Sequence, residues 1–535
     1  MIWVRLLHIF IFCFGPYCMF SQSLIDGGTS LPLFIIDTYD NEIPNEPKIE
    51  AHLGIIHSTD KTNYITDPFN IYNGRIGVEI RGNGTVNFEK VSYLFETQDE
   101  NGENNNVSLL DFPKENDWVL YGPLIDRSLL RNVLTYDLAR EMGYYASRTQ
   151  FCEVLINGEY LGVYVFMEKI KRDKNRVDIT KFEDEDSSPT DGGYLFKIDS
   201  WWNESIGWQS NTYSINDTER KWNYHYLYPK ADEISENQKE YIQNAMHQFE
   251  QGMQLLKTTG SHEVYDLFDE ENFADYFLIN ELSHNPDAYR LSTYFHKDSE
   301  AVDGQIRLGP VWDYNFGFSN YWDRQNEFRG WEYDNDWWEF PHQIPTWWTT
   351  LLDDPHFLNL VRERWAYWRD NLISCDAFSE QINDWHLKLE GPAKRNFAKW
   401  QILEEPNVFD WSAGNTYQDE LDYLNTFICQ RILWMDEALD FKDKSIASSP
   451  KLENLEIFPN PSDGNINIRS VEGFSIVPHT LKLYTINGVQ VFNQVLVPNP
   501  DENDLNFNYT GSEAGFYILE VSNSTSSHKS KIIIR

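Results

Sequence analysis

Apolar and polar residues alternate at period two in several segments of the first half of the chain. This alternation is typical of a β-strand with one buried face. It predicts strands over residues 75–81 and 93–96, with a turn at Gly82-Asn83-Gly84 after the first of them. The clearest hairpin spans residues 151–168, because Asn157-Gly158 near its centre is a favoured two-residue turn.

Helical periodicity, with apolar residues three and four positions apart, dominates the second half. The first helix is expected over residues 126–143, with Asp126 as its N-terminal cap and Gly143 at its C-terminal end. A capping-box pattern at Ser235-Glu-Asn-Gln238 predicts the start of another helix, and residues 353–439 are mostly helical in pattern. Strands followed by helices indicate an α+β fold.

The pattern changes again after residue 440. Residues 441–451 are mostly polar and predict a linker. From residue 452 to residue 535, short alternating segments are separated by turns, which predicts a small all-β sandwich. We therefore expect a main domain over residues 22–440 and a C-terminal domain over residues 452–535.

The N-terminus has the pattern of an export signal. A single charged residue, Arg5, precedes an apolar run that ends at Phe20, and polar residues 21–23 follow. The run is interrupted by Gly15-Pro16 and is too short to span a bilayer, so a cleaved signal peptide over residues 1–21 is favoured over a membrane anchor. No later segment is apolar enough to span, and we expect no transmembrane segment in the mature chain.

The composition narrows the possible functions. The 535 residues include 84 acidic and 44 basic side chains, a net charge of −40, and this balance argues against a nucleic-acid partner. A hydrophobic content of 41% and an aromatic content of 15% are sufficient for a large packed core. Beyond the signal, Cys152, Cys375 and Cys429 are too few for a disulfide framework, although one bridge is possible.

Two aspartates lie at the ends of a predicted strand pair. Asp287, in Asn285-Pro-Asp287, precedes a strand over residues 291–295, and Asp313 follows a strand over residues 306–308. A hairpin returns its two ends to one place, so the two carboxylates are expected to converge. Phosphoryl transfer needs such groups, to hold Mg²⁺ and to orient the acceptor hydroxyl. An aspartate that follows a tryptophan is also common as a turn or cap residue.

An ordered series of motifs over about residues 50–440 resembles the spore-coat protein H (CotH) kinase-like family. The motifs are Arg81-Gly-Asn83, Glu115-Asn-Asp-Trp118, Arg131-Asn132, Asn157-Gly-Glu-Tyr-Leu-Gly-Val-Tyr164, Glu168, Gly192-Gly-Tyr-Leu-Phe-Lys197, Asn285-Pro-Asp287 and Pro310-Val-Trp-Asp313. The resemblance implies an atypical kinase-like domain. Its implied activity is transfer of phosphate from ATP, with Mg²⁺ or Mn²⁺, to Ser or Thr of a secreted or surface protein.

The resemblance also implies roles for particular residues. Asp287 would be the catalytic aspartate and Asp313 the metal ligand. Further metal ligands would come from Asn315 and Ser292. The candidates for the nucleotide pocket are Lys90, Arg131, Glu168 and Lys197.

Each pocket candidate has a structural alternative. Lys90 and Lys197 are also compatible with solvated strand positions. Arg131 and Glu168 are also compatible with ordinary ion pairs.

The sequence departs from the family pattern at two positions. Val91 follows Lys90 where the family often has a second lysine, and Ser292 stands five residues after Asp287 where kinase-like loops carry asparagine. A hydroxyl is a poorer Mg²⁺ ligand than an amide carbonyl, so the metal site would be weaker or would rely on Asn315. A catalytically silent surface, adhesion or assembly protein with the same fold therefore stays open. A secreted hydrolase with paired carboxylates is a third possibility.

A tryptophan-rich segment over residues 331–348 also has two interpretations. Its tryptophans stand among acidic residues and would suit a substrate groove for a sugar or a peptide. Burial in the core or a lid is the alternative that we favour.

The C-terminal residues resemble the type A sorting domain of the Bacteroidetes type IX secretion system. The motifs are Ile457-Phe-Pro-Asn-Pro461, Asp463-Gly464, Leu483-Tyr-Thr-Ile-Asn-Gly488, Ala514-Gly-Phe-Tyr517 and the terminal residues 531–535. The resemblance implies recognition by the type IX secretion machinery after passage through the periplasm. The protein is then expected to be secreted or held at the cell surface.

Overall fold

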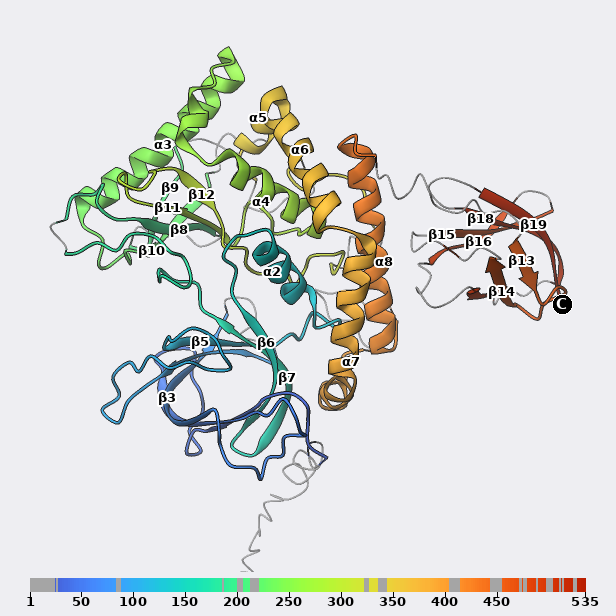
Figure 1. The fold of residues 1–535 in the computed structure, drawn as a ribbon, viewed down its shortest axis with the longest axis horizontal. Coiled ribbons are helices and arrows are strands. Elements are labelled where there is room, and N and C mark those ends of the chain that lie inside the picture. The colour runs from blue at the N-terminus through green and yellow to red at the C-terminus, as the bar shows by residue number, and fades with distance from the viewer. Residues whose placement is uncertain are drawn as a thin grey trace, which may run out of the picture. The chain divides into compact units, whose positions relative to one another are not determined.

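The structure is a computed structural model, and Figure 1 shows its fold. It describes residues 25, 27–82, 88–184, 187–199, 205–211, 221–321, 327–334, 344–403, 414–442, 455–470, 474, 479–486, 489–496, 504–509, 511, 514–522 and 527–535. The expected signal peptide, Asn83-Gly84, Trp337, Trp338 and most of the expected linker lie outside the described residues.

The chain divides into two compact units. The first, called the barrel unit here, comprises the described residues within 25–127, 147–169 and 386–403. The second unit comprises the described residues within 128–146, 170–385 and 414–535.

A closed β-barrel forms the barrel unit, with strand order β1-β2-β3-β4-β5-β7-β6 (Figure 1). Neighbouring strands are antiparallel except β1 and β6, whose parallel pairing closes the barrel. The strands are β1 (Leu33–Asp37), β2 (Ile49–Ile56), β3 (Tyr72–Arg81), β4 (Ser92–Thr97), β5 (Asp117–Tyr121), β6 (Thr149–Ile156) and β7 (Glu159–Glu168).

Aromatic side chains fill the barrel. Phe166 on β7 lies at their centre, with ring centroids 5.1 Å from Phe112, 5.1 Å from Trp118 and 5.2 Å from Phe34. Burying rings of this size is a large part of the stability of such a core. The expected Asn157-Gly158 hairpin is confirmed: both residues have positive φ, 50° and 77°, as its turn type requires.

The second unit contains an antiparallel sheet and most of the helices. The sheet order is β12-β11-β8-β10-β9, with β8 (Tyr194–Asp199), β9 (Gly207–Gln209), β10 (Asn223–Tyr228), β11 (Thr293–Lys297) and β12 (Ile306–Leu308). The helices are α2 (Arg131–Glu141), α3 (Glu236–Thr259), the 3-10 helix η2 (Glu263–Leu267), α4 (Glu270–Ser283), α5 (Trp347–Asp353), α6 (Pro355–Asn371), α7 (Cys375–Lys399) and α8 (Tyr417–Ala438). Helix α7 continues from this unit into the barrel unit. Strands followed by helices confirm the α+β prediction.

The start predicted for α3 is confirmed, whereas the start predicted for α2 is wrong. Ser235 and Gln238 form the expected capping box of α3. Helix α2 begins at Arg131 instead of after Asp126. Leu129 has φ +66°, a left-handed conformation that cannot continue an α-helix, so the helix cannot extend back to Asp126.

One disulfide cross-links two helices of the second unit. A disulfide joins Cys375 at the start of α7 to Cys429 on α8, and Cys152 is a buried free thiol. The sequence allowed one bridge without specifying its pair. Trp347 and Trp348 are buried in α5, as expected for core residues.

The C-terminal residues form two sheets around one core, which confirms the all-β prediction. One sheet has the order β13-β14-β17 and the other β16-β15-β18-β19. The strands are β13 (Leu455–Phe458), β14 (Asn465–Ser470), β15 (His479–Thr485), β16 (Gln490–Leu496), β17 (Asp504–Asn508), β18 (Gly515–Ser522) and β19 (Ser527–Ile534). Their inward side chains, such as Ile468 and Leu519, are fully buried.

Candidate functional site

The loops that carry the two candidate aspartates meet in the second unit. Strands β11 and β12 pair as the sequence predicts, with Phe295 opposite Leu308. The side-chain amide of Asn285 donates a hydrogen bond to the backbone carbonyl of Asp313, at 3.4 Å. The Asn285-Pro-Asp287 loop therefore lies beside the Trp312-Asp313 loop.

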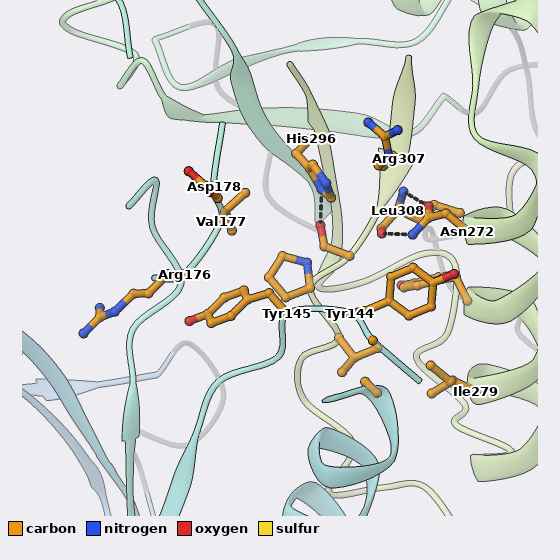
Figure 2. A pocket seen from close by; sticks show the side chains of 16 residues that line it. Tyr144, Tyr145, Arg176, Val177, Asp178, Asn272, Ile279, His296, Arg307 and Leu308 are labelled. Carbon is orange, nitrogen blue, oxygen red and sulfur yellow. Dashed lines mark hydrogen bonds between the residues drawn. The ribbon is translucent and has the colours of Figure 1, made fainter. Parts of the chain in front are cut away.

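A cavity of about 230 Å³ lies against the segment that leads to Asp313 (Figure 2). Gly309, Pro310 and Val311 line it, together with His296. The imidazole Nδ1 of His296 bonds the Gly309 carbonyl at 3.2 Å, and burial lowers the pKa of this ring to about 4, which keeps it neutral at physiological pH. Asp287 and Asp313 do not line this cavity, so it is distinct from the aspartate site.

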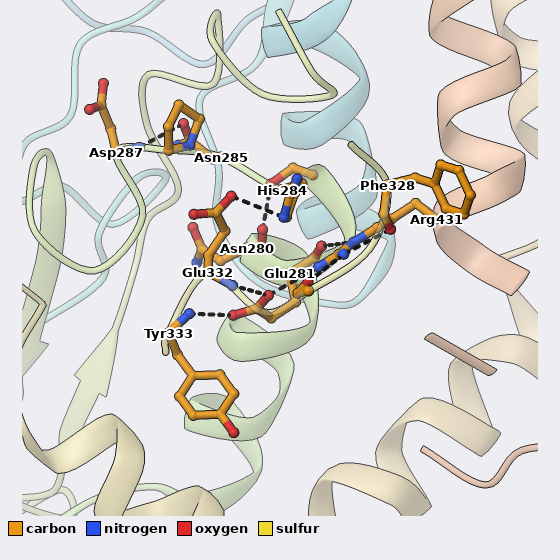
Figure 3. A network of polar contacts seen from close by, with 12 residues as sticks. Asn280, Glu281, His284, Asn285, Asp287, Phe328, Glu332, Tyr333 and Arg431 are labelled. Atoms are coloured by element: carbon orange, nitrogen blue, oxygen red, sulfur yellow. Dashed lines mark hydrogen bonds and ion pairs between the residues drawn. The ribbon is translucent and has the colours of Figure 1, made fainter. Parts of the chain in front are cut away.

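Asp287 is oriented by its own loop. Its carboxylate accepts a hydrogen bond from Arg290 at 2.7 Å, and its backbone amide donates to the Asn285 side chain at 3.2 Å. Figure 3 shows the Asp287 carboxylate directed away from Asn285. With 22% of its side chain exposed, Asp287 is partly accessible to solvent.

Helix α2 holds the Asp313 loop by its backbone. The Asp313 amide donates to the Tyr136 hydroxyl at 3.1 Å, and the Tyr314 amide donates to the Asn132 side chain at 2.6 Å. Arg131 Nε donates to the Gly317 carbonyl at 3.0 Å. Asp313 itself has φ +69°, a left-handed conformation that aspartate tolerates better than most residues. These contacts fix the backbone of the Asp313 loop.

The α2 contacts also explain why a helix with so many polar residues is buried. Arg131, Asn132 and Tyr136 have at most 3% exposure because they face the loop that they hold. The sequence marked Arg131 as a nucleotide-pocket candidate and did not identify Tyr136. The geometry gives Arg131 a positioning contact, and a direct contact with a nucleotide stays a prediction.

Lys90 lies in the barrel unit and is almost fully buried. Its ammonium group donates to the Val163 carbonyl at 2.6 Å and to the Asn396 side chain at 2.8 Å, and lies 4.9 Å from the ring centre of Tyr164. Burial holds the pKa of Lys90 well below its ordinary value. The residue is thus not a solvated strand lysine.

Glu168, at the end of β7, is also fully buried in the barrel unit. Its carboxylate accepts from the Arg148 guanidinium at 2.8 Å and from the Arg148 backbone amide at 3.1 Å. Glu168 is therefore an ion-pair partner, which was the structural alternative. A role of Glu168 in the nucleotide pocket stays a prediction.

Lys197 lies on β8, directly opposite Tyr294 on β11, in the strand that follows the Asp287 loop. Its ammonium group pairs with Asp199 and lies 5.8 Å from the Tyr294 ring centre. Asn315 is buried two residues after Asp313, and Ser292 stands directly before β11 with φ +46°. Lys197 is thus the cationic pocket candidate on the sheet that contains the β11–β12 hairpin.

The proposed metal ligands offer only oxygen atoms. Asp313, Asn315 and Ser292 supply a carboxylate, an amide carbonyl and a hydroxyl, which suit Mg²⁺. Within the described ranges, no group of three or more His, Cys, Asp and Glu side chains is arranged to hold a metal. Mg²⁺ commonly takes one or two protein carboxylates and completes its shell with water and substrate phosphates, so this donor set fits a nucleotide-bound cation.

Comparison with known families identifies the larger part of the chain. A family model described as CotH kinase protein matches residues 78–435. The chain belongs to the CotH family. The match begins within β3, so strands β1 and β2 of this CotH protein's barrel precede the matched region.

A second family model, the secretion system C-terminal sorting domain, matches residues 456–535. This CotH protein therefore carries the tail that type IX secretion handles, which leads to the cell surface or to secretion. A search of curated proteins finds no match to the chain. None of the helices in the described ranges is both long enough and apolar enough to cross a membrane.

Proposed function

We propose that this CotH protein is an exported protein kinase that transfers phosphate from ATP to Ser or Thr of a secreted or surface protein. The observation that carries the proposal is the contact between Asn285 and Asp313. This contact places the loop of Asp287, whose side chain is partly exposed, beside the loop of Asp313, whose backbone is held by α2. Phosphoryl transfer depends mainly on such positioning of charged groups.

Each loop has a distinct role in this proposal. Asp287 orients the acceptor hydroxyl and takes up its proton, with Arg290 fixing the carboxylate. Asp313 and Asn315, with Ser292, hold the Mg²⁺ or Mn²⁺. When bound, the cation neutralises charge on the phosphates of ATP.

A catalytically silent adhesion or assembly protein is the second candidate. It is favoured by the burial of Lys90 and Arg131, whose side chains bond to protein carbonyls that a nucleotide would have to replace. The kinase proposal therefore depends on Lys197, and not on Lys90 or Arg131, to bind the phosphates. Lys197 lies on the strand paired with β11.

Purified protein incubated with labelled ATP and Mg²⁺ or Mn²⁺ tests the proposal. We expect cation-dependent thermal stabilisation by ATP, and transfer of the γ-phosphate to the protein itself or to exported proteins from the same cells. Absence of both stabilisation and transfer would favour the silent protein. Release of free phosphate without transfer to protein would also contradict the kinase proposal.

A further inference from the structure

Glu281, near the end of α4, is a fully buried carboxylate that receives hydrogen bonds from three separate segments. Figure 3 shows its contacts with Glu332, Tyr333 and Arg431. Oε1 accepts from the Tyr289 hydroxyl at 2.9 Å and from the Tyr333 amide at 3.0 Å. Oε2 accepts from the Glu332 amide at 2.8 Å and from Arg431 on α8 at 3.1 Å. The carboxylate thus connects the Asp287 loop, residues 328–333 and α8.

Arg431 on α8 also binds the backbone of α4 and of residues 328–330 directly. Its guanidinium donates to the Glu281 carbonyl at 2.6 Å, to the Phe328 carbonyl at 3.0 Å and to the Gly330 carbonyl at 2.6 Å. Glu281 and Arg431 together therefore bind amides and carbonyls of one short segment, residues 328–333, called the docked segment here. Both side chains are fully buried, where an ion pair needs such additional hydrogen bonds to offset desolvation.

Aromatic contacts fix the docked segment against α4. The ring centroids of Trp331 and Tyr333 lie 5.7 Å and 5.6 Å from that of Phe277 on α4. Trp331 also packs on Trp434 of α8, with ring centroids 4.6 Å apart. Trp331 is thus packed on both α4 and α8.

The same network reaches both sides of the Asp287 loop. Before the loop, His284 Nε2 lies 3.1 Å from a carboxylate oxygen of Glu332, and both residues are 3% exposed. After the loop, Tyr289 binds Glu281 and packs on Trp348, with ring centroids 4.6 Å apart. Burial raises the pKa of Tyr289 well above its ordinary value, so its hydroxyl keeps the proton that it donates. The docked segment and Glu281 therefore bracket residues 285–288.

We propose that Glu281 is a positioning residue for Asp287, and that it couples the docking of residues 328–333 to the geometry of the Asp287 loop. The inference rests on the proposed kinase function, because Asp287 is the group whose position matters for transfer. Three hydrogen bonds between α2 and the Asp313 loop do not involve Glu281, so we expect loss of Glu281 to affect phosphate transfer more than nucleotide binding.

Helix α4 offers a matched control. Asp275 is a second fully buried carboxylate on the same helix, and it is also paired with an arginine. It accepts from Tyr144 at 2.7 Å and from Trp368 at 2.7 Å, and it pairs with Arg364. These partners belong neither to the docked segment nor to the Asp287 loop. A purely structural role for Glu281 predicts the same behaviour for both carboxylates.

The test compares Glu281→Gln, Tyr289→Phe and Asp275→Asn in the full protein at about pH 8.5, because burial raises the pKa of Glu281 to about 7 and the carboxylate must be ionised. We expect kcat for transfer to fall on the order of 10- to 100-fold in Glu281→Gln, with KM for ATP nearly unchanged. Amide hydrogen exchange should accelerate at residues 332–333 and 287–291. Asp275→Asn should lower Tm without these effects.

Tyr289→Phe removes only the hydrogen bond between Glu281 and the Asp287 loop and leaves the net charge unchanged. This variant therefore tests the coupling even if Glu281→Gln does not fold. It should accelerate exchange at residues 287–291 and lower kcat. Equal losses of kcat in Asp275→Asn and Tyr289→Phe would overturn the coupling, and so would an unchanged kcat in Tyr289→Phe. If the wild type transfers no phosphate, the kinase proposal fails separately. Unaltered exchange at residues 287–291 in Tyr289→Phe would then overturn the coupling itself.

Discussion

Lys90 and Asn396 are 306 residues apart in the chain, and their side chains are hydrogen-bonded at 2.8 Å in the barrel unit. The same Asn396 oxygen accepts from the Val163 amide at 3.1 Å. Gly162, with φ +92°, lies so close to this oxygen that a Cβ would approach it to 2.4 Å. The glycine of the Asn157–Tyr164 motif thus permits Asn396 to reach both Lys90 and β7.

The burial of Lys90 makes stability depend on pH in a defined direction. Because its pKa is lower in the folded protein than in the unfolded chain, the unfolded chain binds more protons between the folded pKa and about pH 10.5. The free energy of unfolding of wild type, relative to Lys90→Met, should therefore rise with pH across this window.

Urea denaturation between about pH 7 and pH 9.5 measures this difference. Lys394→Met is the control, because Lys394 is exposed on the same helix as Asn396. Parallel pH curves for wild type and Lys90→Met would contradict the buried, weakly basic state of Lys90.

Asp313→Asn should weaken nucleotide binding with little change in stability. Asparagine keeps the side-chain shape and tolerates the left-handed φ of +69°. The α2 contacts to the Asp313 loop use backbone atoms, so they survive the substitution. Thermal melts with and without Mg-ATP measure both quantities, and equal stabilisation of wild type and variant would refute the metal assignment.

Asp287→Asn should reduce phosphate transfer and leave nucleotide binding intact. The variant should retain stabilisation by Mg-ATP, because Asp287 acts on the acceptor hydroxyl in the proposed mechanism. Loss of a positioned base lowers the rate by about 10²- to 10⁴-fold. Transfer of labelled phosphate at saturating ATP is the measurement. A cost of roughly 0.5–2 kcal/mol in stability with unaltered transfer would instead identify Asp287 as a turn residue.

Arg131→Lys should loosen the Asp313 loop. Lysine retains the charge but cannot reproduce the contacts that the guanidinium makes with Gly317 and Ser128. Leaving buried acceptors unsatisfied costs about 1–3 kcal/mol of stability, and stabilisation by Mg-ATP should decrease as well.

Arg140→Lys provides the comparison for this variant, because Arg140 lies on the same helix in a partly exposed pair with Asp137. A loss of Mg-ATP stabilisation without any loss of stability would show that Arg131 contacts the nucleotide directly.

Removal of the Cys375–Cys429 disulfide should lower stability by about 2–4 kcal/mol, because the bridge closes a long loop, with a sequence separation of 54 residues. The double variant Cys375→Ser/Cys429→Ser and reduced wild type should show similar losses in Tm. Cys152→Ser should not respond differently to reductant from wild type, since Cys152 is a free thiol. Insensitivity of wild-type Tm to a reductant that breaks the bridge would contradict its contribution.

The sequence alone determined the features that depend on neighbours in the chain. Positive φ at Asn157 and Gly158 makes a tight hairpin turn, and the Ser235 capping box satisfies the first amides of α3. The β11–β12 hairpin follows from two short strand patterns, and it brings the Asp287 and Asp313 loops together. Turn chemistry and periodicity act over a few residues, so they can be read directly.

Tertiary structure decided what the buried charges do. Local periodicity placed the start of α2 at Asp126, whereas the helix begins at Arg131, whose side chain reaches the Gly317 carbonyl. The partners of Lys90 and Glu281 come from segments far away in the chain, Asn396 and Arg431 among them. A buried charge is stable only with such partners, and the sequence does not show which distant segments meet it in the fold.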